Sequence, residues 1–176
     1  VAMVTTPDQL DIIRRESPDL IVSVGFDHLV PPGIIEIPSE GAINLHPSLL
    51  PHNRGKSPNV WPLVEGNPAG VTLHYMDPEF DTGDIIAQRE VKTDFSDTGK
   101  QLHSRLEDAQ FELFSTTWPE IESDTVDATP QDDTDGSYHS KTDFLDLCEL
   151  DPEAEVEVKQ FLNRLRALTF PPFDNA

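Results

Sequence analysis

The chain has 176 residues, of which 36% are hydrophobic, and this length and composition fit a globular domain better than a disordered polypeptide. No apolar run approaches the ~18 residues of a membrane span, and no secretory signal is visible at the start. The single Cys148 excludes an internal disulfide framework. We therefore expect a cytoplasmic domain with no membrane partner. The formal net charge of −21 disfavours a nucleic-acid-binding face, because no basic cluster is present to neutralise phosphates.

The first part of the chain alternates helical and strand patterns. A short helix is expected after Thr6, which stands at the cap, with Pro7 at the first helical position. The apolar run over 20–25 predicts a strand covered on both faces, and residues 41–45 predict a second buried strand. A further helix is expected within 57–66, between a Ser-Pro start and a glycine stop.

The second part of the chain continues this alternation. Two strands are predicted over 71–76 and 85–91, the second with one face in water because apolar and polar residues alternate. A long amphipathic helix is expected from Thr98 to about Thr117. An acidic, threonine-rich loop follows over 123–136, and a last helix is expected over 153–168.

This order of elements predicts an α/β fold, Rossmann-like, with a mostly parallel sheet and flanking helices. A doubly wound sheet usually opens on a strand, whereas this chain opens on a helix, so the opening βα units are expected to be missing. We divide the chain into a catalytic core, residues 1–122, and a C-terminal loop and helix extension, residues 123–176.

Chemically capable side chains gather at the predicted strand ends and in the loop after the third strand: Asn44, His46, His74, Asp77, Asp81 and Asp84. Asn44 and His46 lie at alternate positions, so both side chains point to one face. An amide donor beside an imidazole suits the stabilisation of an oxyanion as a carbonyl is attacked. A carboxylate such as Asp81 would fix the tautomer of the histidine, raise its pKa and help remove a proton.

Other interpretations of these residues remain open. A histidine at a strand end is often structural, and the stretch 81–84, Asp-Thr-Gly-Asp, is also a turn pattern. A metal site that uses His46, His52 and His74 is disfavoured, because no spacing of the His-Glu-x-x-His kind is present. A serine hydrolase is disfavoured for lack of a Gly-x-Ser-x-Gly elbow. We therefore expect no metal.

Three segments carry a longer pattern: GAINLHPSLLPHNRG at 41–55, GVTLHYM at 70–76 and FDTGDI at 80–85. From about Pro18 to Val91 the chain closely resembles the folate-dependent formyltransferase family. A weaker likeness covers 136–139 and 165–173, which are similar to the tails of sugar and tRNA formyltransferases. The resemblance implies a Rossmann-like formyltransferase fold and an enzyme that transfers a formyl group from 10-formyltetrahydrofolate to an amine.

The resemblance also implies roles for single residues. Asn44, His46 and Asp81 match the catalytic residues: Asn44 and protonated His46 would stabilise the oxyanion, while Asp81 orients His46 and assists proton removal. His74 matches a histidine close to the cofactor site in some members of the family, and it is a candidate substrate residue. Arg54 lies in the loop after the catalytic histidine, where it is either a substrate contact or part of a structural turn. The pterin of the formyl donor would be held by Phe26, His28, Leu29, Val30, Met76, Asp77, Pro78, Glu79 and Phe80.

The acceptor amine is the least determined part of this interpretation. We favour an amino sugar attached to a nucleotide, because the chain is acidic and nothing after Leu168 supplies a basic tRNA-binding domain. Methionyl-tRNA is the alternative acceptor. A formyltetrahydrofolate hydrolase with water as acceptor and an inactive folate-binding remnant are further alternatives. A homodimer is an additional expectation.

The acidic composition also predicts a dependence on salt. Only five residues are Lys and 19 are Asp, and the sequence pI is ≈ 4.3. Repulsion within such a surface destabilises the fold in dilute buffer, whereas ~1 M salt shortens the Debye length to about 3 Å. The composition therefore indicates a protein adapted to high cytoplasmic salt, as in halophiles, with an ordinary acidic protein as the alternative.

Overall fold

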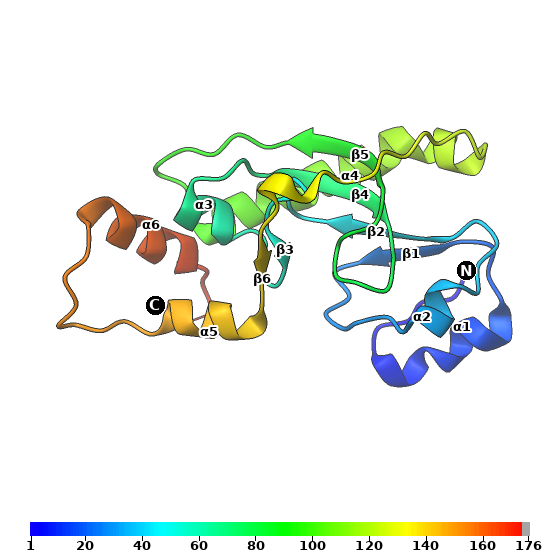
Figure 1. Cartoon of the computed structure of the whole chain (residues 1–176), viewed down its shortest axis with the longest axis horizontal. Helices are drawn as coiled ribbons and strands as arrows, with labels where there is room; N and C mark the ends of the chain where they lie inside the picture. Colours follow the sequence, from blue (N-terminus) through cyan, green and yellow to red (C-terminus); the bar gives the residue numbers. More distant parts are fainter. Residues whose placement is uncertain (174–176) are drawn as a thin grey trace.

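Strands and helices alternate along an elongated α/β structure, with the N-terminal helices at one end and the C-terminal helices at the other (Figure 1). The computed structural model describes residues 1–173, so the last three residues of the predicted C-terminal extension lie outside it. The strands are β1 (Ile21–Val24), β2 (Ala42–His46), β3 (Arg54–Gly55), β4 (Gly70–Tyr75), β5 (Ile85–Glu90) and β6 (Tyr138–His139). The α-helices are α1 (Asp11–Glu16), α2 (Pro32–Ile35), α3 (Trp61–Glu65), α4 (Gly99–Glu122), α5 (Lys141–Cys148) and α6 (Val158–Leu168), with short 3-10 helices at Pro7–Gln9 and Asp133–Asp135.

The main sheet has four strands in the order β1–β2–β4–β5, and a second sheet pairs β3 with β6. The α/β class is confirmed, but the expectation of a mostly parallel sheet is wrong for the described strands. Only β1 and β2 are parallel in the main sheet, and β2–β4 and β4–β5 are antiparallel. For β4 and β5 the reason is the length of the connection: a parallel return needs a crossover of a dozen or more residues, and the loop 76–84 is shorter than that. The connection 47–69 between β2 and β4 is long enough for a crossover, so length does not explain that pairing.

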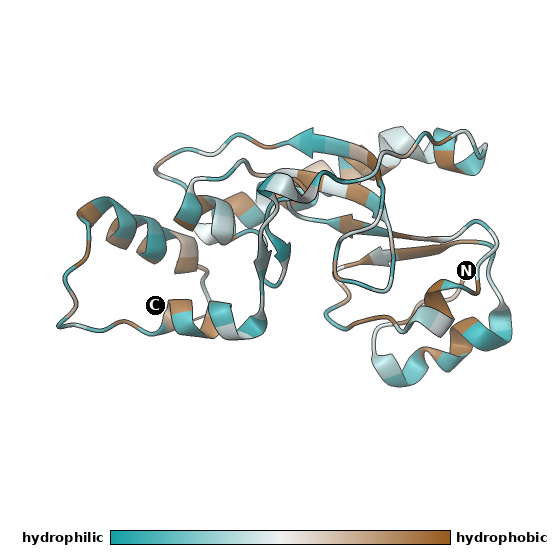
Figure 2. Cartoon of the chain, viewed as in Figure 1, coloured by the Kyte–Doolittle hydropathy of each residue, from teal (hydrophilic) through white to brown (hydrophobic). Residues whose placement is uncertain are grey.

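The first strand departs from its predicted environment. Residues 20–25 were expected to be covered on both faces, yet Val22 is 39% exposed and Val24 is 60% exposed. Figure 2 shows this largely apolar strand between β2 and the N-terminal helices α1 and α2 in the view. Its hydrogen-bonded neighbour in the described structure is β2, so β1 is an edge strand.

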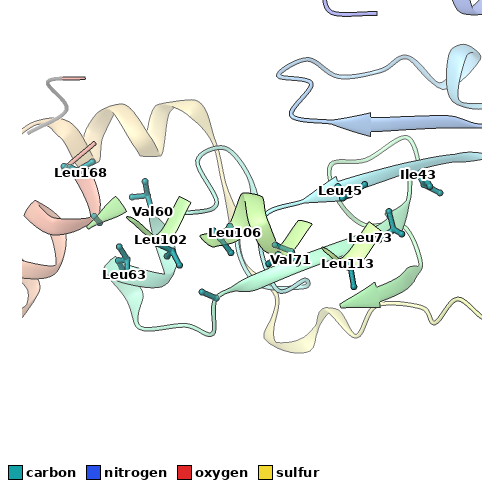
Figure 3. Packing of buried hydrophobic residues seen from close by; sticks show 13 residues of the cluster. Ile43, Leu45, Val60, Leu63, Val71, Leu73, Leu102, Leu106, Leu113 and Leu168 are labelled. Atoms are coloured by element: carbon teal, nitrogen blue, oxygen red, sulfur yellow. The ribbon is translucent and has the colours of Figure 1, made fainter. Parts of the chain in front are cut away.

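One hydrophobic cluster joins the sheet to α4 and to the C-terminal helix. The long helix buries residues at helical spacing, among them Leu102, Leu106 and Leu113, and packs across β4 and β5. Figure 3 shows the cluster running from Leu63 and Leu168, beside α3 and α6, to the residues of β2 and β4. All residues of β4 except the last are buried, which makes it the central strand of this core.

The capping residues in the sequence predict some helix starts correctly and others incorrectly. Thr98 accepts from the backbone N–H of Gln101, whose side chain bonds back to the Thr98 backbone, so the predicted start of α4 is a complete capping box. Thr6 stands at the N-cap and Pro7 at the first helical position, as predicted, but the Thr6 side chain makes no cap hydrogen bond. The Gln9 side chain accepts from the Thr5 backbone N–H instead. Helix α3 begins at Trp61 rather than near Pro58, because residue Ser57 adopts a left-handed backbone conformation (φ 54°).

The C-terminal segment is built of more helix than the sequence predicts. Helix α5, which starts at a capping box between Ser140 and Asp143, was not predicted, and the last helix begins at Val158 rather than at residue 153. Arg166 fastens α6 to the core by donating to the carbonyls of Leu63, Asp94 and Asp97. The segment after residue 122 therefore packs on the core, and our boundary at 122/123 stays a prediction.

Within residues 1–173, no helix combines the length and the apolar character that crossing a bilayer requires.

Candidate active site

Four of the six polar residues singled out in the sequence meet where β2 ends beside β4. The other two lie apart from them: Asp77 bonds within its own loop and Asp84 is exposed. Ile43 and Leu45 of β2 point into the core, so Asn44 and His46 share the opposite face of the strand. The antiparallel register places His74 of β4 directly opposite Asn44. Asp81 enters from the loop 76–84, and the structure thus brings Asn44, His46, His74 and Asp81 together.

The His46 ring is buried between two oxygen acceptors. Its Nε2 donates to the carbonyl of Asn53 at 3.1 Å, and its Nδ1 lies 3.5 Å from Oδ1 of Asp81. These two contacts fix the plane of the ring. The carboxylate was expected to raise the pKa of His46; burial lowers this pKa, and the opposing contributions of Asp81 and of the Asn53 carbonyl do not offset it.

The Asn44 side chain holds two partners at once. Its Nδ2 donates to Oδ1 of Asp81 at 3.3 Å and lies 3.2 Å from Nε2 of His74. The other ring nitrogen of His74, Nδ1, lies 2.7 Å from the carbonyl of Tyr75. A carbonyl only accepts, so the proton of His74 is assigned to Nδ1, and Nε2 accepts from Asn44. His74 is 2% exposed, and its contact with Nδ2 orients the side-chain amide of Asn44 from β4.

Asp81 receives contacts from three directions. Its Oδ2 accepts from the backbone N–H of Gly55 at 2.9 Å, and its Oδ1 faces Asn44 and both histidines. Burial raises the pKa of Asp81, but the charge of His46 and the contacts with His74 and Gly55 outweigh it, and the pKa falls to about 2. The carboxylate is therefore ionised at neutral pH.

The two segments predicted to hold the pterin both adjoin β3. Lys56, which follows β3, pairs with Asp27 of the first segment at 2.8 Å, and Gly55 binds Asp81 at the end of the second. In the first segment Val30 is buried, Leu29 is 49% exposed, and the Phe26 and His28 rings pack edge to face at 5.5 Å. Among residues 1–173, the backbone groups of 27–30 bond to no other backbone group.

The second predicted segment is a tight loop with one exposed aromatic ring. Thr82 Oγ1 and the Glu79 N–H both donate to the Asp77 carboxylate, which closes the loop on itself. Phe80 is 46% exposed and its ring lies 6.2 Å from that of Tyr138 in β6. Met76 is half-buried, while Pro78 and Glu79 are exposed.

Arg54 is half-buried in β3, where its main chain stands in register with Tyr138 of β6. A separate cleft of about 480 Å³ lies between α3, β6, α5 and α6. It contains a stacked pair, Trp61 and His139, with ring centroids 3.8 Å apart. None of the predicted site residues lines that cleft.

Several groups that shape the site were missed by sequence reasoning, namely the Asn53 carbonyl, the Gly55 N–H, Gln131 and Ser137. The first two are backbone groups, which carry no residue-type signal. Asn53 gives a partial clue, since asparagine before a glycine-containing turn favours the left-handed conformation that it adopts here (φ 59°). Gln131 and Ser137 lie in the stretch after α4, which the sequence marks only as loop.

Comparison with known proteins identifies the family. A family model described as Formyl transferase matches residues 3–117, and one described as N-formyltransferase dimerization C-terminal domain matches residues 143–176. Methionyl-tRNA formyltransferase from Syntrophus aciditrophicus is 36% identical over 170 residues, which cover 94% of this chain and 53% of that protein. The chain spans between 40% and 53% of the length of the first curated relatives that it matches.

Two solved structures are similar over most of the chain. A 4-N formyltransferase from Francisella tularensis superimposes with a TM-score of 0.87 at 29% identity, over 97% of this chain and 69% of that one. The formyltransferase PseJ from Anoxybacillus kamchatkensis, solved with UDP-4,6-dideoxy-4-formamido-L-AltNAc and tetrahydrofolate, is 42% identical with a TM-score of 0.67, over 71% of this chain and 66% of that one. Together with the family match over residues 3–117, they show that this chain belongs to the formyl transferase family.

Proposed function

We propose that the protein transfers a formyl group from 10-formyltetrahydrofolate to an amine. The observation that carries this proposal is the contact of Asn44, His46 and Asp81 beside two loops that expose the apolar side chains Leu29 and Phe80. The amine nitrogen attacks the formyl carbon, a new C–N bond forms, and the bond from that carbon to N10 of the folate breaks. One proton passes from the attacking nitrogen to N10, so the step balances.

In this mechanism the oxyanion is stabilised by Asn44 and His46. The Asn44 amide, which donates to Asp81 in the structure, donates to the formyl oxygen as charge develops. Burial lowers the pKa of His46 and the Asp81 carboxylate opposes this, so a negative charge that develops beside the ring favours its cationic form. Stabilisation that appears with the transition state raises the rate more than equal binding of the ground state does.

Asp81 serves as the fixed anion of the site. A carboxylate with a pKa of about 2 is a weak base toward a neutral amine. The attacking nitrogen becomes cationic in the tetrahedral intermediate, and there a weak base suffices to accept its proton and relay it toward N10. The same carboxylate holds Nδ1 of His46, which keeps the imidazole facing the reaction.

The loops 26–30 and 76–80 are proposed to hold the pterin of the formyl donor. Unpaired backbone groups at 27–30 suit the donors and acceptors of a pterin ring, and the exposed Leu29 and Phe80 offer apolar contact. PseJ, which is 42% identical over the matched part, was solved with tetrahydrofolate, and this supports the same donor here.

For the acceptor we propose an amino sugar attached to a nucleotide. Such a substrate carries two phosphates, which one or two cations and some backbone N–H groups can hold. A tRNA presents a dense array of phosphates and needs many cations. Most of the basic side chains here already bond within the chain: Arg14, Arg15, Lys56, Arg89, Lys100, Arg105, Arg164 and Arg166.

Methionyl-tRNA is the second candidate acceptor, because curated relatives that are 36–41% identical are methionyl-tRNA formyltransferases. The two candidates are separated by one assay. The protein is supplied with 10-formyltetrahydrofolate, 3-amino and 4-amino deoxysugar nucleotides and methionyl-tRNA, at high KCl. We expect formylation of an amino-sugar nucleotide.

Three other outcomes of that assay would contradict the proposal at different levels. Formylation of methionyl-tRNA with no sugar formylated would overturn the acceptor and leave the reaction standing. Release of formate without an acceptor would indicate a hydrolase. Folate binding without turnover would indicate an inactive folate-binding protein.

We also propose a homodimer formed through the C-terminal segment. Residues 143–176 match the dimerization domain model, and this segment exposes apolar side chains on α5, on α6, in the connection between them and after α6: Leu145, Leu150, Val156, Val158, Phe161, Leu162 and Phe173. Sedimentation equilibrium should give a dimer that Phe161→Glu weakens. A monomer at all concentrations would refute this assembly.

A further inference from the structure

The segment 129–139, which we call the strap, touches the candidate active site at several points although it lies far along the chain from β2. At its start Thr129 and Ile85 exchange two backbone hydrogen bonds of 2.8 Å. At its end, Tyr138–His139 of β6 pairs with Arg54–Gly55 of β3. In Figure 1 the strap is the yellow chain that returns from the end of α4 toward β6.

The first contact of the strap with the site is made by Gln131. Its Nε2 donates to the carbonyl of Asp81 at 2.9 Å and to the carbonyl of Gly83 at 2.8 Å. One amide group thus holds the main chain on both sides of Thr82. Its Oε1 is buried and accepts no hydrogen bond from the described residues, so the amide contributes here only as a donor.

The second contact is made by Ser137. Its Oγ accepts from the backbone N–H of Asn53 at 2.8 Å and lies 3.3 Å from Oδ1 of the same residue. The carbonyl of Asn53 is the acceptor for Nε2 of His46. Ser137 therefore restrains Asn53, whose carbonyl in turn holds the His46 ring.

Both residues held by the strap have a left-handed backbone. Asp81 has φ 55° and Asn53 has φ 59°, in the region that asparagine and aspartate tolerate better than other side chains do. Gln131 and Ser137 restrain the main chain at these two turns, one for each member of the pair His46 and Asp81.

We propose that the strap is a positioning element of the active site, in which Gln131 sets the main chain that carries Asp81 and Ser137 sets the Asn53 carbonyl that holds His46. The proposal rests on the function proposed above. It assigns no contact with substrate to either residue. Both act through another residue, so a small displacement of a reacting group is the effect that their loss should produce.

The test compares two variants of the full chain, Gln131→Met and Ser137→Ala, with Gln101→Met as a matched control. Gln101 is also a capping amide, but it serves the start of α4 and touches none of the site residues. The measurements are kcat, KM for the formyl donor, thermal stability, and the titration of His46 followed by NMR, with the His46→Gln spectrum used for assignment.

We expect kcat to fall by about 10- to 100-fold in both strap variants with KM for the donor unchanged, as for a misplaced reacting group. We also expect the pKa of His46 to fall further, since Asp81 and the Asn53 carbonyl raise it while burial and His74 lower it. Ser137→Thr keeps the hydroxyl and should restore both values. Gln101→Met should lose stability only.

Wild-type kcat and wild-type His46 titration in both strap variants would overturn the proposal. A wild-type protein that formylates no acceptor would instead overturn the proposed function. In that case the NMR titration still decides the strap, because it needs no turnover.

Discussion

Asp81→Asn tests the electrostatics of the site through stability. The pKa of Asp81 falls from an ordinary 3.8 to about 2, and its side chain is 13% exposed. The shift is nearly two units, and one unit corresponds to about 1.4 kcal/mol, so the ionised carboxylate stabilises the fold by about 2 kcal/mol. The asparagine still accepts from the Gly55 N–H but loses the charge that faces His46.

The sign of this contribution fixes its dependence on pH. A carboxylate whose pKa is lower in the folded state stabilises the fold above its unfolded pKa. The difference in unfolding free energy between wild type and Asp81→Asn should therefore be about 2 kcal/mol near pH 7 and should shrink as the pH falls from about 4 to about 2.

The assay is urea unfolding followed by the fluorescence of the two tryptophans, at constant KCl and several pH values. Asp84→Asn is the matched control: it makes the same change in the same loop, at an exposed side chain, and should leave the unfolding free energy unchanged. The reasoning would be refuted if Asp81→Asn were as stable as wild type near neutral pH. It would equally be refuted if the difference stayed constant down to about pH 2.

Three further predictions concern catalysis, salt and packing. Asn44→Ala should lower kcat by ~10²–10³ with folding retained by circular dichroism, and an unchanged kcat would exclude its role as oxyanion donor. The melting temperature should rise from ~0.1 M to ~1 M KCl, and an equal rise in sucrose would point to preferential exclusion instead of charge screening. Gly83→Ala should destabilise by about 1–3 kcal/mol, because its Cβ would lie 2.0 Å from the Tyr75 carbonyl oxygen. Gly33→Ala, which meets only ordinary contacts, should be near neutral in the same thermal melts.

The elements that the sequence predicted well are those whose local signals agree with their packing. Helix α4 has both an apolar stripe and a capping box, and its start was predicted at Thr98. Helix α5 carries a capping box at Ser140, and Phe144, Leu147 and Cys148 stand at helical spacing, but this short helix was not predicted from the sequence. The covered environment expected for β1 was wrong, because a run of β-branched residues shows strand propensity and not how many neighbours the strand has.

The site shows the same division. The alternate positions of Asn44 and His46 on a strand place them on one face by geometry alone. That Asp81 would join them was implied by the resemblance and not by any spacing. The lowered pKa of His46 was missed because the sequence shows the carboxylate partner but not the depth of burial. Contacts made through backbone groups, as at Asn53 and Gly55, are visible only after folding.

The single-sided support of β1 has a consequence for motion in the folded state. In the described sheet this strand hydrogen-bonds to β2 alone, so its amides should exchange with solvent hydrogen through local opening long before those of the buried β4. The segment 26–30 directly follows β1, and Val30 anchors it to the interior. A ligand that orders segment 26–30 binds the protein only while β1 remains paired with β2. Such binding therefore raises the free energy of the local opening of β1. Amide exchange in Ile21–Val24 would thus report the binding of a ligand at the neighbouring segment 26–30.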